Sequence, residues 1–254
     1  MNSLKTLLKK EFFEAFVTKK ILILWITCLG IGLMSPIFAK FTPNVLALYA
    51  PKGMNFSIGV PSAKDAWYQF FKDGPSMSVL ISVLCFSNSI PNEIESGSIV
   101  NVLSKGIGRN VFFCSKLVAA LITWICAIII CVTSCYIYTQ ILFNDNTPIN
   151  WCVSLIGPMC FGIFAISLLF LFEAISANAL YSIGCTIAFF VLLLVINIFK
   201  VVNKYNPISL IQNNTEYIFS LTNPQFFYWK IGVCIILITI INCLALKKFK
   251  NLAI

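Results

Sequence analysis

Six apolar runs of near membrane-spanning length dominate the sequence and leave few folds open to it. They cover residues 21–39, 75–91, 117–140, 151–172, 180–199 and 230–246. A transmembrane helix needs roughly 20 mostly apolar residues, and helices satisfy their own backbone hydrogen bonds in lipid. Hydrophobic residues make up 59% of the 254 positions, too many for an ordinary soluble domain. We therefore expect an all-α polytopic membrane protein with one transmembrane domain over residues 1–254.

The boundaries between these runs predict where the chain leaves the membrane. The fourth and fifth runs are nearly continuous and are broken only around residues 173–178, which favours a tight helical hairpin over one overlong helix. Residues 40–74 and 200–229 form two long outer segments. A short outer connection covers residues 141–150.

Lysines near the span ends predict the orientation, because cytoplasmic flanks collect positive charge. They precede the first run and follow the last one at Lys5, Lys9, Lys10, Lys19, Lys20, Lys247, Lys248 and Lys250. Both termini are therefore expected in the cytoplasm, together with the connection between the second and third runs. A cleaved signal peptide is the alternative for residues 21–39, but the run is longer than an ordinary h-region and more spans follow. The Lys-rich, Arg-poor and Ile-rich composition suggests an AT-rich bacterial genome. In a bacterium, the expected location of such a protein is the plasma membrane.

Composition also argues against several functional classes. The net charge of +9 comes from cations at span ends, which suits membrane lipid headgroups better than nucleic acid. All eleven cysteines lie in or beside apolar runs and the chain has no histidine, so neither a metal site nor a cofactor is expected. Residues 104–109 lack the spacing of a P-loop. We expect no enzymatic activity in this chain.

Residues 2–18 are predicted to form an amphipathic elbow helix before the first span. Its apolar positions include Leu4, Leu8, Phe12 and Phe16, which recur at helical spacing. Such a helix suits the inner leaflet as a simple lipid anchor. The alternative is a brace that also contacts a cytoplasmic partner.

The polar connection between the second and third spans is longer than a turn requires. It carries Glu93 and Glu95, then Gly97 and Ser98, then a short aliphatic stretch that ends before Lys105 and Arg109. This pattern predicts a short docking helix that ends at glycine. An ordinary solvated loop is the alternative.

This connection resembles the first cytoplasmic loop of ABC-2 type transporter permeases. The shared pattern is Glu-x-Glu-x-Gly-Ser, an aliphatic pair, Ser-Lys-x-x-x-Arg and a downstream Lys116. Residues 60–72 are similar to the outer segment before the second span in one branch of the family. The chain departs from the family pattern at Ile94, at Ser98 in place of threonine, and at residues 106–108 in place of Pro-Val-Ser.

The resemblance implies a permease subunit of an ATP-driven exporter. Two copies of a separate ABC ATPase would bind the inner face, and a second permease subunit would complete a homodimer or heterodimer. The matching coupling residues are Glu93, Glu95, Gly97, Ser98, Lys105 and Arg109. The mostly apolar spans favour a hydrophobic or amphipathic cargo, such as a drug, an antimicrobial peptide or a lipid-linked molecule.

The sequence also suggests positions for two charged residues near span ends. Lys116 is expected to extend its ammonium group to the lipid headgroups. Glu173 is expected either in the cytoplasmic turn or along an inner vestibule, because an acid in lipid is costly.

The alternative function is a self-contained six-span protein, channel-like or of the immunity type, without an ATPase partner.

Overall fold

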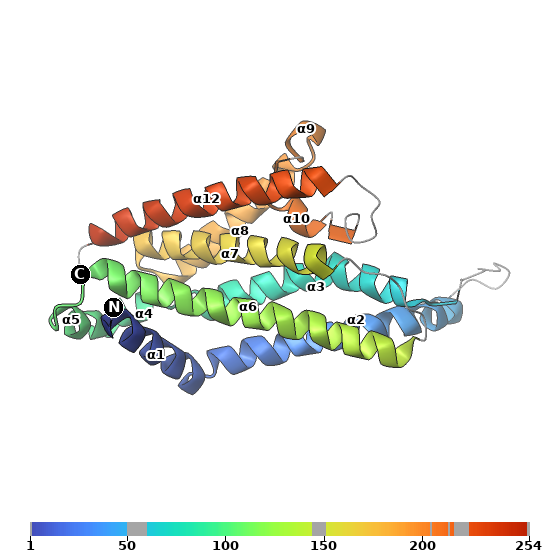
Figure 1. The fold of residues 1–254 in the computed structure, drawn as a ribbon, viewed down its shortest axis with the longest axis horizontal. Coiled ribbons are helices and arrows are strands. Elements are labelled where there is room, and N and C mark those ends of the chain that lie inside the picture. The colour runs from blue at the N-terminus through green and yellow to red at the C-terminus, as the bar shows by residue number, and fades with distance from the viewer. Residues whose placement is uncertain are drawn as a thin grey trace.

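The computed structural model describes residues 2–49, 60–143, 151–203, 205–212, 214–215 and 224–252, and every regular element among them is a helix. The long helices run along the long axis of one elongated bundle (Figure 1). They are α2 (Lys20–Tyr49), α3 (Ala63–Phe86), α6 (Arg109–Leu142), α7 (Trp151–Ser176), α8 (Ala179–Ile196) and α12 (Pro224–Lys250).

In the described part of the chain, five helical segments are long and apolar enough to cross a membrane. They are Lys20–Pro43, Arg109–Leu142, Leu155–Ser176, Ala179–Ile196 and Phe227–Lys250. The predicted second span, at residues 75–91, is not among these five. It falls on α3, which begins earlier, at Ala63, and ends earlier, at Phe86. The first part of α3 carries Lys64, Asp65, Lys72 and Asp73, so it lacks the apolar length of the other five.

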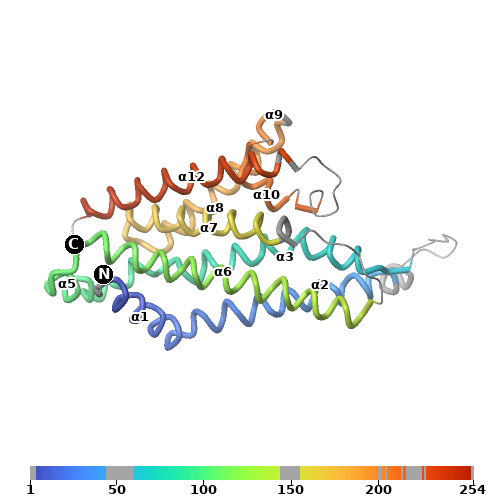
Figure 2. Tube along the Cα trace, viewed as in Figure 1, coloured from blue at the N-terminus to red at the C-terminus, as the bar shows by residue number. Residues whose placement is uncertain are grey.

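Short helices occupy the two ends of the bundle. α1 (Asn2–Val17), α4 (Pro91–Glu95) and α5 (Ser98–Leu103) lie together at one end, and the described end of α12 also reaches it (Figures 1 and 2). α9 (Lys200–Asn203) and α10 (Ser209–Gln212) lie toward the other end. The first and last described helices, α1 and α12, therefore bring both described ends of the chain to the same end of the bundle.

The outer segments are more helical than predicted. α2 continues to Tyr49, well past the expected end of the first span at residue 39, and α3 begins at Ala63. The predicted outer segment 200–229 contains α9, α10 and the start of α12, while residues 144–150 of the short outer connection lie outside the described part of the chain.

Local capping explains two of the helix starts. The carboxylate of Asp65 accepts hydrogen bonds from the Ser62 backbone N–H at 2.9 Å and the Ser62 hydroxyl at 2.7 Å, which fixes the first turn of α3. Asn178 Oδ1 accepts from Tyr181 N at 3.1 Å and starts α8. The predicted hairpin break is confirmed, but α7 extends to Ser176 instead of ending at residue 172, and the chain turns at Ala177, where φ is 50°.

The helices pack closely enough to leave little room at the glycines between them. α2 packs against α3 and α6, and α7 packs against α12. A Cβ atom built on Gly32 of α2 would collide with Cys131 O and Ser134 Oγ of α6. On the same helix, Gly30 has no atom within 4 Å of such a Cβ. Gly32 therefore sets the separation of α2 and α6.

We predict that Gly32→Ala lowers the free energy of unfolding of the purified chain by about 1–3 kcal/mol, because the colliding Cys131 oxygen belongs to the backbone and cannot rotate away. Gly30→Ala is the matched control and should be neutral or slightly stabilising, since alanine favours helix. Thermal unfolding in detergent measures both. Equal effects of the two substitutions would contradict this account of the α2 and α6 contact.

Candidate functional site

The predicted docking helix is in fact two short helices, α4 and α5. Gly97 separates them with a φ of 66°, in the left-handed region that glycine adopts without steric cost. Among the predicted coupling residues, Glu95, Gly97 and Lys105 are exposed, and Ser98 and Arg109 are half-buried. This connection therefore presents a polar surface at the end of the bundle that carries α1 (Figure 1).

Glu93 does not share that surface. Its Oε1 lies 2.6 Å from Lys10 Nζ and 2.8 Å from Lys116 Nζ, and its side chain is buried. The resemblance groups Glu93 with Glu95 as coupling residues, but only Glu95 is exposed. Residues two positions apart point to nearly opposite sides of a helix, so when Glu95 faces solvent, Glu93 faces the bundle.

Lys116 is buried as well, so the expectation that it reaches the lipid headgroups is wrong. Its Nζ donates to Glu11 Oε2 at 2.9 Å and also pairs with Glu93. The side chains of Lys116, Glu93 and Glu11 are 3%, 3% and 9% exposed. Because these residues come from α6, α4 and α1, the two ion pairs join three helices.

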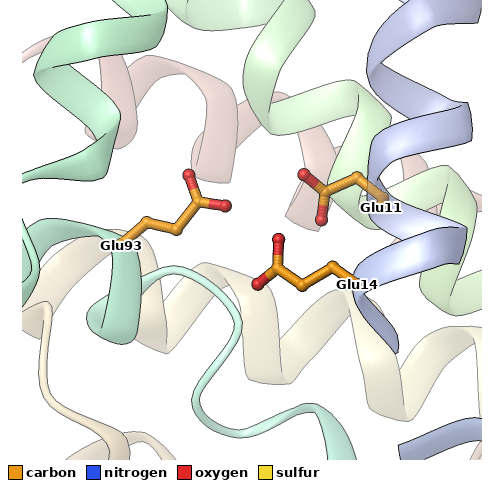
Figure 3. A group of neighbouring side chains, drawn as sticks. All are labelled: Glu11, Glu14 and Glu93. Atoms are coloured by element: carbon orange, nitrogen blue, oxygen red, sulfur yellow. The ribbon is translucent and has the colours of Figure 1, made fainter. Parts of the chain in front are cut away.

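Lys10 and Glu14 complete the group at its outer edge. Lys10 Nζ lies 3.6 Å from Glu11 Oε1 and 3.5 Å from Glu14 Oε2, and its side chain is 40% exposed. Figure 3 shows Glu11 and Glu14 extending from α1 toward Glu93. We call these five residues, Lys10, Glu11, Glu14, Glu93 and Lys116, the ionic cluster.

The ionic cluster resembles a metal site in its acids but not in its surroundings. One carboxylate oxygen each from Glu11, Glu14 and Glu93 lies within 4.8 Å of the others. However, the ammonium groups of Lys10 and Lys116 already lie among these oxygens. Three carboxylates and two ammonium groups leave a formal charge of −1. The arrangement therefore suits an ion-paired joint between helices better than a site for a divalent cation.

A small polar cavity adjoins the ionic cluster. It has a volume of about 40 Å³ and is lined by residues of α1, α2, α3 and α6, and by the turn after α3. Glu11 Oε1 and Glu93 Oε2 are buried and have no hydrogen-bond partner among the described residues. Since a cavity of this size and polarity has room for water, hydration is the natural source of partners for Glu11, which lines it.

Charge pairing shifts the pKa of two groups in the ionic cluster. Burial alone would raise the pKa of Glu93, but the Lys116 charge and the hydrogen bond from Lys10 outweigh it, so the pKa lies below its ordinary value. Burial alone would lower the pKa of Lys10, yet Glu93, Glu11 and Glu14 together raise it. Each shift favours the charged form, so Glu93 and Lys10 are both charged near neutral pH.

Glu173 lies in neither of its predicted places. It is fully buried in the last turns of α7, before the turn at Ala177. Its carboxylate accepts hydrogen bonds from Ile90 N at 3.1 Å and Ser89 N at 3.4 Å. A carboxylate at this position satisfies free N–H groups where α4 begins. Glu173 therefore fastens α4 to α7.

Arg109 fastens the other end of the connection. Its Nη1 donates to Lys250 O at 3.0 Å and to Leu252 O at 2.7 Å, at the end of α12. Cationic side chains commonly bind the free carbonyl groups at a helix C-terminus. The side chain predicted to contact an ATPase is thus engaged within the chain.

The elbow helix also packs differently from its predicted apolar face. Leu4, Leu8 and Phe12 are partly buried, and Phe16 is 57% exposed. The buried positions of α1 are Leu7 and Glu11. α1 therefore contacts α6 through a stripe that contains an acid, and its exposed aromatic side chains are left for lipid.

Sequence reasoning missed Lys10, Glu11, Glu14 and Lys116 as members of one site. A signal was present in two places. Glu11 follows Leu7 by one helical turn and so interrupts the apolar stripe of α1, and Lys116 interrupts the apolar sequence of α6. A charge within an apolar stripe predicts a buried partner.

Comparison with known proteins supports the membrane class but no finer family. No family model matches the chain. YxlG of Bacillus subtilis (strain 168), described as an uncharacterized transmembrane protein, is 21% identical over 263 residues, covering 99% of this chain and 98% of the relative. Together with the five long apolar helices, this likeness identifies the chain as a helical membrane protein.

We predict that Lys116→Met lowers the free energy of unfolding by about 3–5 kcal/mol, because it leaves Glu11 and Glu93 buried without their central partner. Lys105→Met removes an exposed lysine on the same side of the bundle and should change stability by less than about 0.5 kcal/mol. Unfolding of both variants in the same detergent gives the comparison. A Lys116→Met variant as stable as the control would show that the ion pairs contribute nothing.

We also predict that acid weakens the fold through Glu93. Its pKa is below the ordinary 4.5, so its contribution is present above that value and is lost as the pH falls through the lowered folded-state pKa. Stability of the wild type should therefore fall more steeply than that of Glu93→Gln between about pH 6 and about pH 3. Parallel curves for the two proteins would rule out Glu93 as a source of the acid sensitivity.

Proposed function

We propose that this chain is the permease subunit of an ATP-driven ABC exporter of the ABC-2 type. The observation that carries the proposal is the ion-paired joint of α1, α4 and α6. A partner that pushes on α4 and α5 would move α6, a 34-residue helix with membrane-spanning length and hydropathy. Coupling between a cytoplasmic motor and a membrane path requires such a stiff connection.

The proposal assigns new roles to the predicted coupling residues. Glu95, Gly97, Ser98 and Lys105 are accessible to a partner, as is Val100, which is 54% exposed on α5. An apolar residue among polar ones suits insertion into a groove of another protein. Glu93 and Arg109 act from behind this surface by holding α4 and α5 on the bundle.

The remaining parts of the proposal concern assembly and cargo. Two permease subunits, identical or different, would pair with two ATPase subunits, which supply the ATP hydrolysis. Both termini and the α4–α5 connection would face the cytoplasm of a bacterium, and the bacterial source of the relative supports that setting. The cargo class we favour is a hydrophobic or amphipathic compound, carried outward.

A self-contained membrane protein is the competing proposal. The internal contacts of Glu93 and Arg109 favour it to some degree, because they explain two of the motif residues without any partner. It differs from the permease in one measurable respect. Its activity would not depend on the exposed residues of α4 and α5.

We predict that an ABC ATPase copurifies with the tagged chain from its native membrane and is lost when Glu95→Lys and Val100→Asp are combined. Both side chains are exposed, so the variant should keep the unfolding temperature of the wild type. Tyr205→Ala changes an exposed residue near α10, at the other end of the bundle, and should retain the ATPase. Mass spectrometry of the eluates identifies the partner. Absence of any ATPase from the wild-type sample would overturn the permease proposal.

A further inference from the structure

An apolar cavity of about 160 Å³ lies between α3, α7, α8 and α10. Val79 and Leu80 of α3, Phe161 of α7 and Phe190 of α8 form much of its wall. Ile208 and Ile211 close it on the α10 side. α10 lies toward the end of the bundle opposite α4 and α5, so this cavity is separate from the ionic cluster (Figure 1).

The cavity is held in shape by contacts outside its lining. Asn206 Nδ2 donates to Leu193 O of α8 at 2.8 Å, which fixes the chain just before α10. Asn206 itself is buried. The wall that α10 supplies is therefore tied to α8 by a buried hydrogen bond, and the cavity belongs to the folded structure.

Its size and lining define what it can hold. An apolar cavity of about 150 Å³ is large enough to bind a benzene-sized molecule. A space of 160 Å³ with aliphatic and aromatic walls therefore suits one ring or one short alkyl group. A whole phospholipid chain is much too long for it.

Polar groups at one edge of the cavity place a second requirement on its ligand, besides size. Gln212 and Ser76 line the cavity, and Gln212 Oε1 accepts a hydrogen bond from Asn197 Nδ2 at 2.6 Å. A carbonyl oxygen has two lone pairs, so Gln212 Oε1 can accept a second hydrogen bond, and a ligand that donates one at this edge would be favoured. No lysine, arginine or acid lines the cavity, which disfavours a charged ligand.

We propose that this cavity binds a small neutral amphipathic molecule, with a ring or short alkyl group among Val79, Phe161 and Ile208 and a hydrogen-bond donor at Gln212. The site rests on the cavity and its edge alone, so it holds for a permease and for a self-contained protein. Molecules of this class partition into membranes and reach the cavity without an ATPase.

The test uses a photoreactive octanol that carries a diazirine on its alkyl chain. The purified full chain is labelled in detergent, and mass spectrometry maps the labelled residues. We expect labelling on α3, α8 or α10, with benzyl alcohol competing about tenfold better than toluene because only the alcohol donates a hydrogen bond. In Gln212→Leu the two competitors should become equal, because the acceptor that lines the cavity is removed.

Ile208→Trp provides the variant that fills the cavity. Ile208 lines the cavity and is 7% exposed, so the larger side chain stays inside, and the unfolding temperature shows whether the protein is intact. Labelling of the cavity should be lost in this variant. Ile236→Trp on the exposed side of α12 is the matched control and should label like the wild type.

Three results would overturn the proposal. One is labelling that survives Ile208→Trp in an intact protein, and another is labelling spread evenly over the exposed side of α12. The third is labelling that occurs in detergent but disappears in phosphatidylcholine vesicles, since bilayer chains would then be the occupant. None of these measurements involves an ATPase, so failure of the permease proposal and failure of this one are distinguishable.

Discussion

The buried ammonium group of Lys116 between Glu11 and Glu93 determines how the polar end of the molecule is built. Removing three charged side chains from water is costly, and the cost is offset only when the groups stay in contact. α1, α4 and α6 are therefore held at distances that keep both pairs near 2.8–2.9 Å. Apolar side chains could give similar stability but would not require one particular register among the three helices.

The connection between α3 and α6 is best understood as an internal junction. Glu173 holds its beginning on α7, Glu93 holds its middle on α6 and α1, and Arg109 holds its end on α12. Each contact joins a charged group to an opposite charge or to free backbone groups at a helix end. A connection anchored in this way keeps α5 and its exposed residues in a fixed position, which any partner on that side would encounter as a firm surface.

The long helices were predictable because an apolar run of membrane length has few alternatives. The predicted run at residues 75–91 gave the wrong limits for α3, because an apolar run does not reveal the helical turns that precede it among charged residues. The Ser62 and Asp65 capping pair was the signal for that start. For the site, the spacing of Glu93 and Glu95 indicates that only one of them faces outward, but no local pattern indicates that Lys10 and Lys116 meet Glu93. That contact depends on how α1 folds back against α6, which is a property of the assembled bundle.

The positions of these contacts along the chain imply an order of assembly. Residues 11, 93 and 116 all lie in the first half of the chain, so the joint of α1, α4 and α6 can close as soon as α6 has entered the membrane during synthesis. The Glu173 contact becomes available later, and the acceptors of Arg109 at Lys250 and Leu252 come later still. The polar end of the bundle is thus completed only after α12 has been made, and the hydrogen bonds of Arg109 join a helix made early to one made much later.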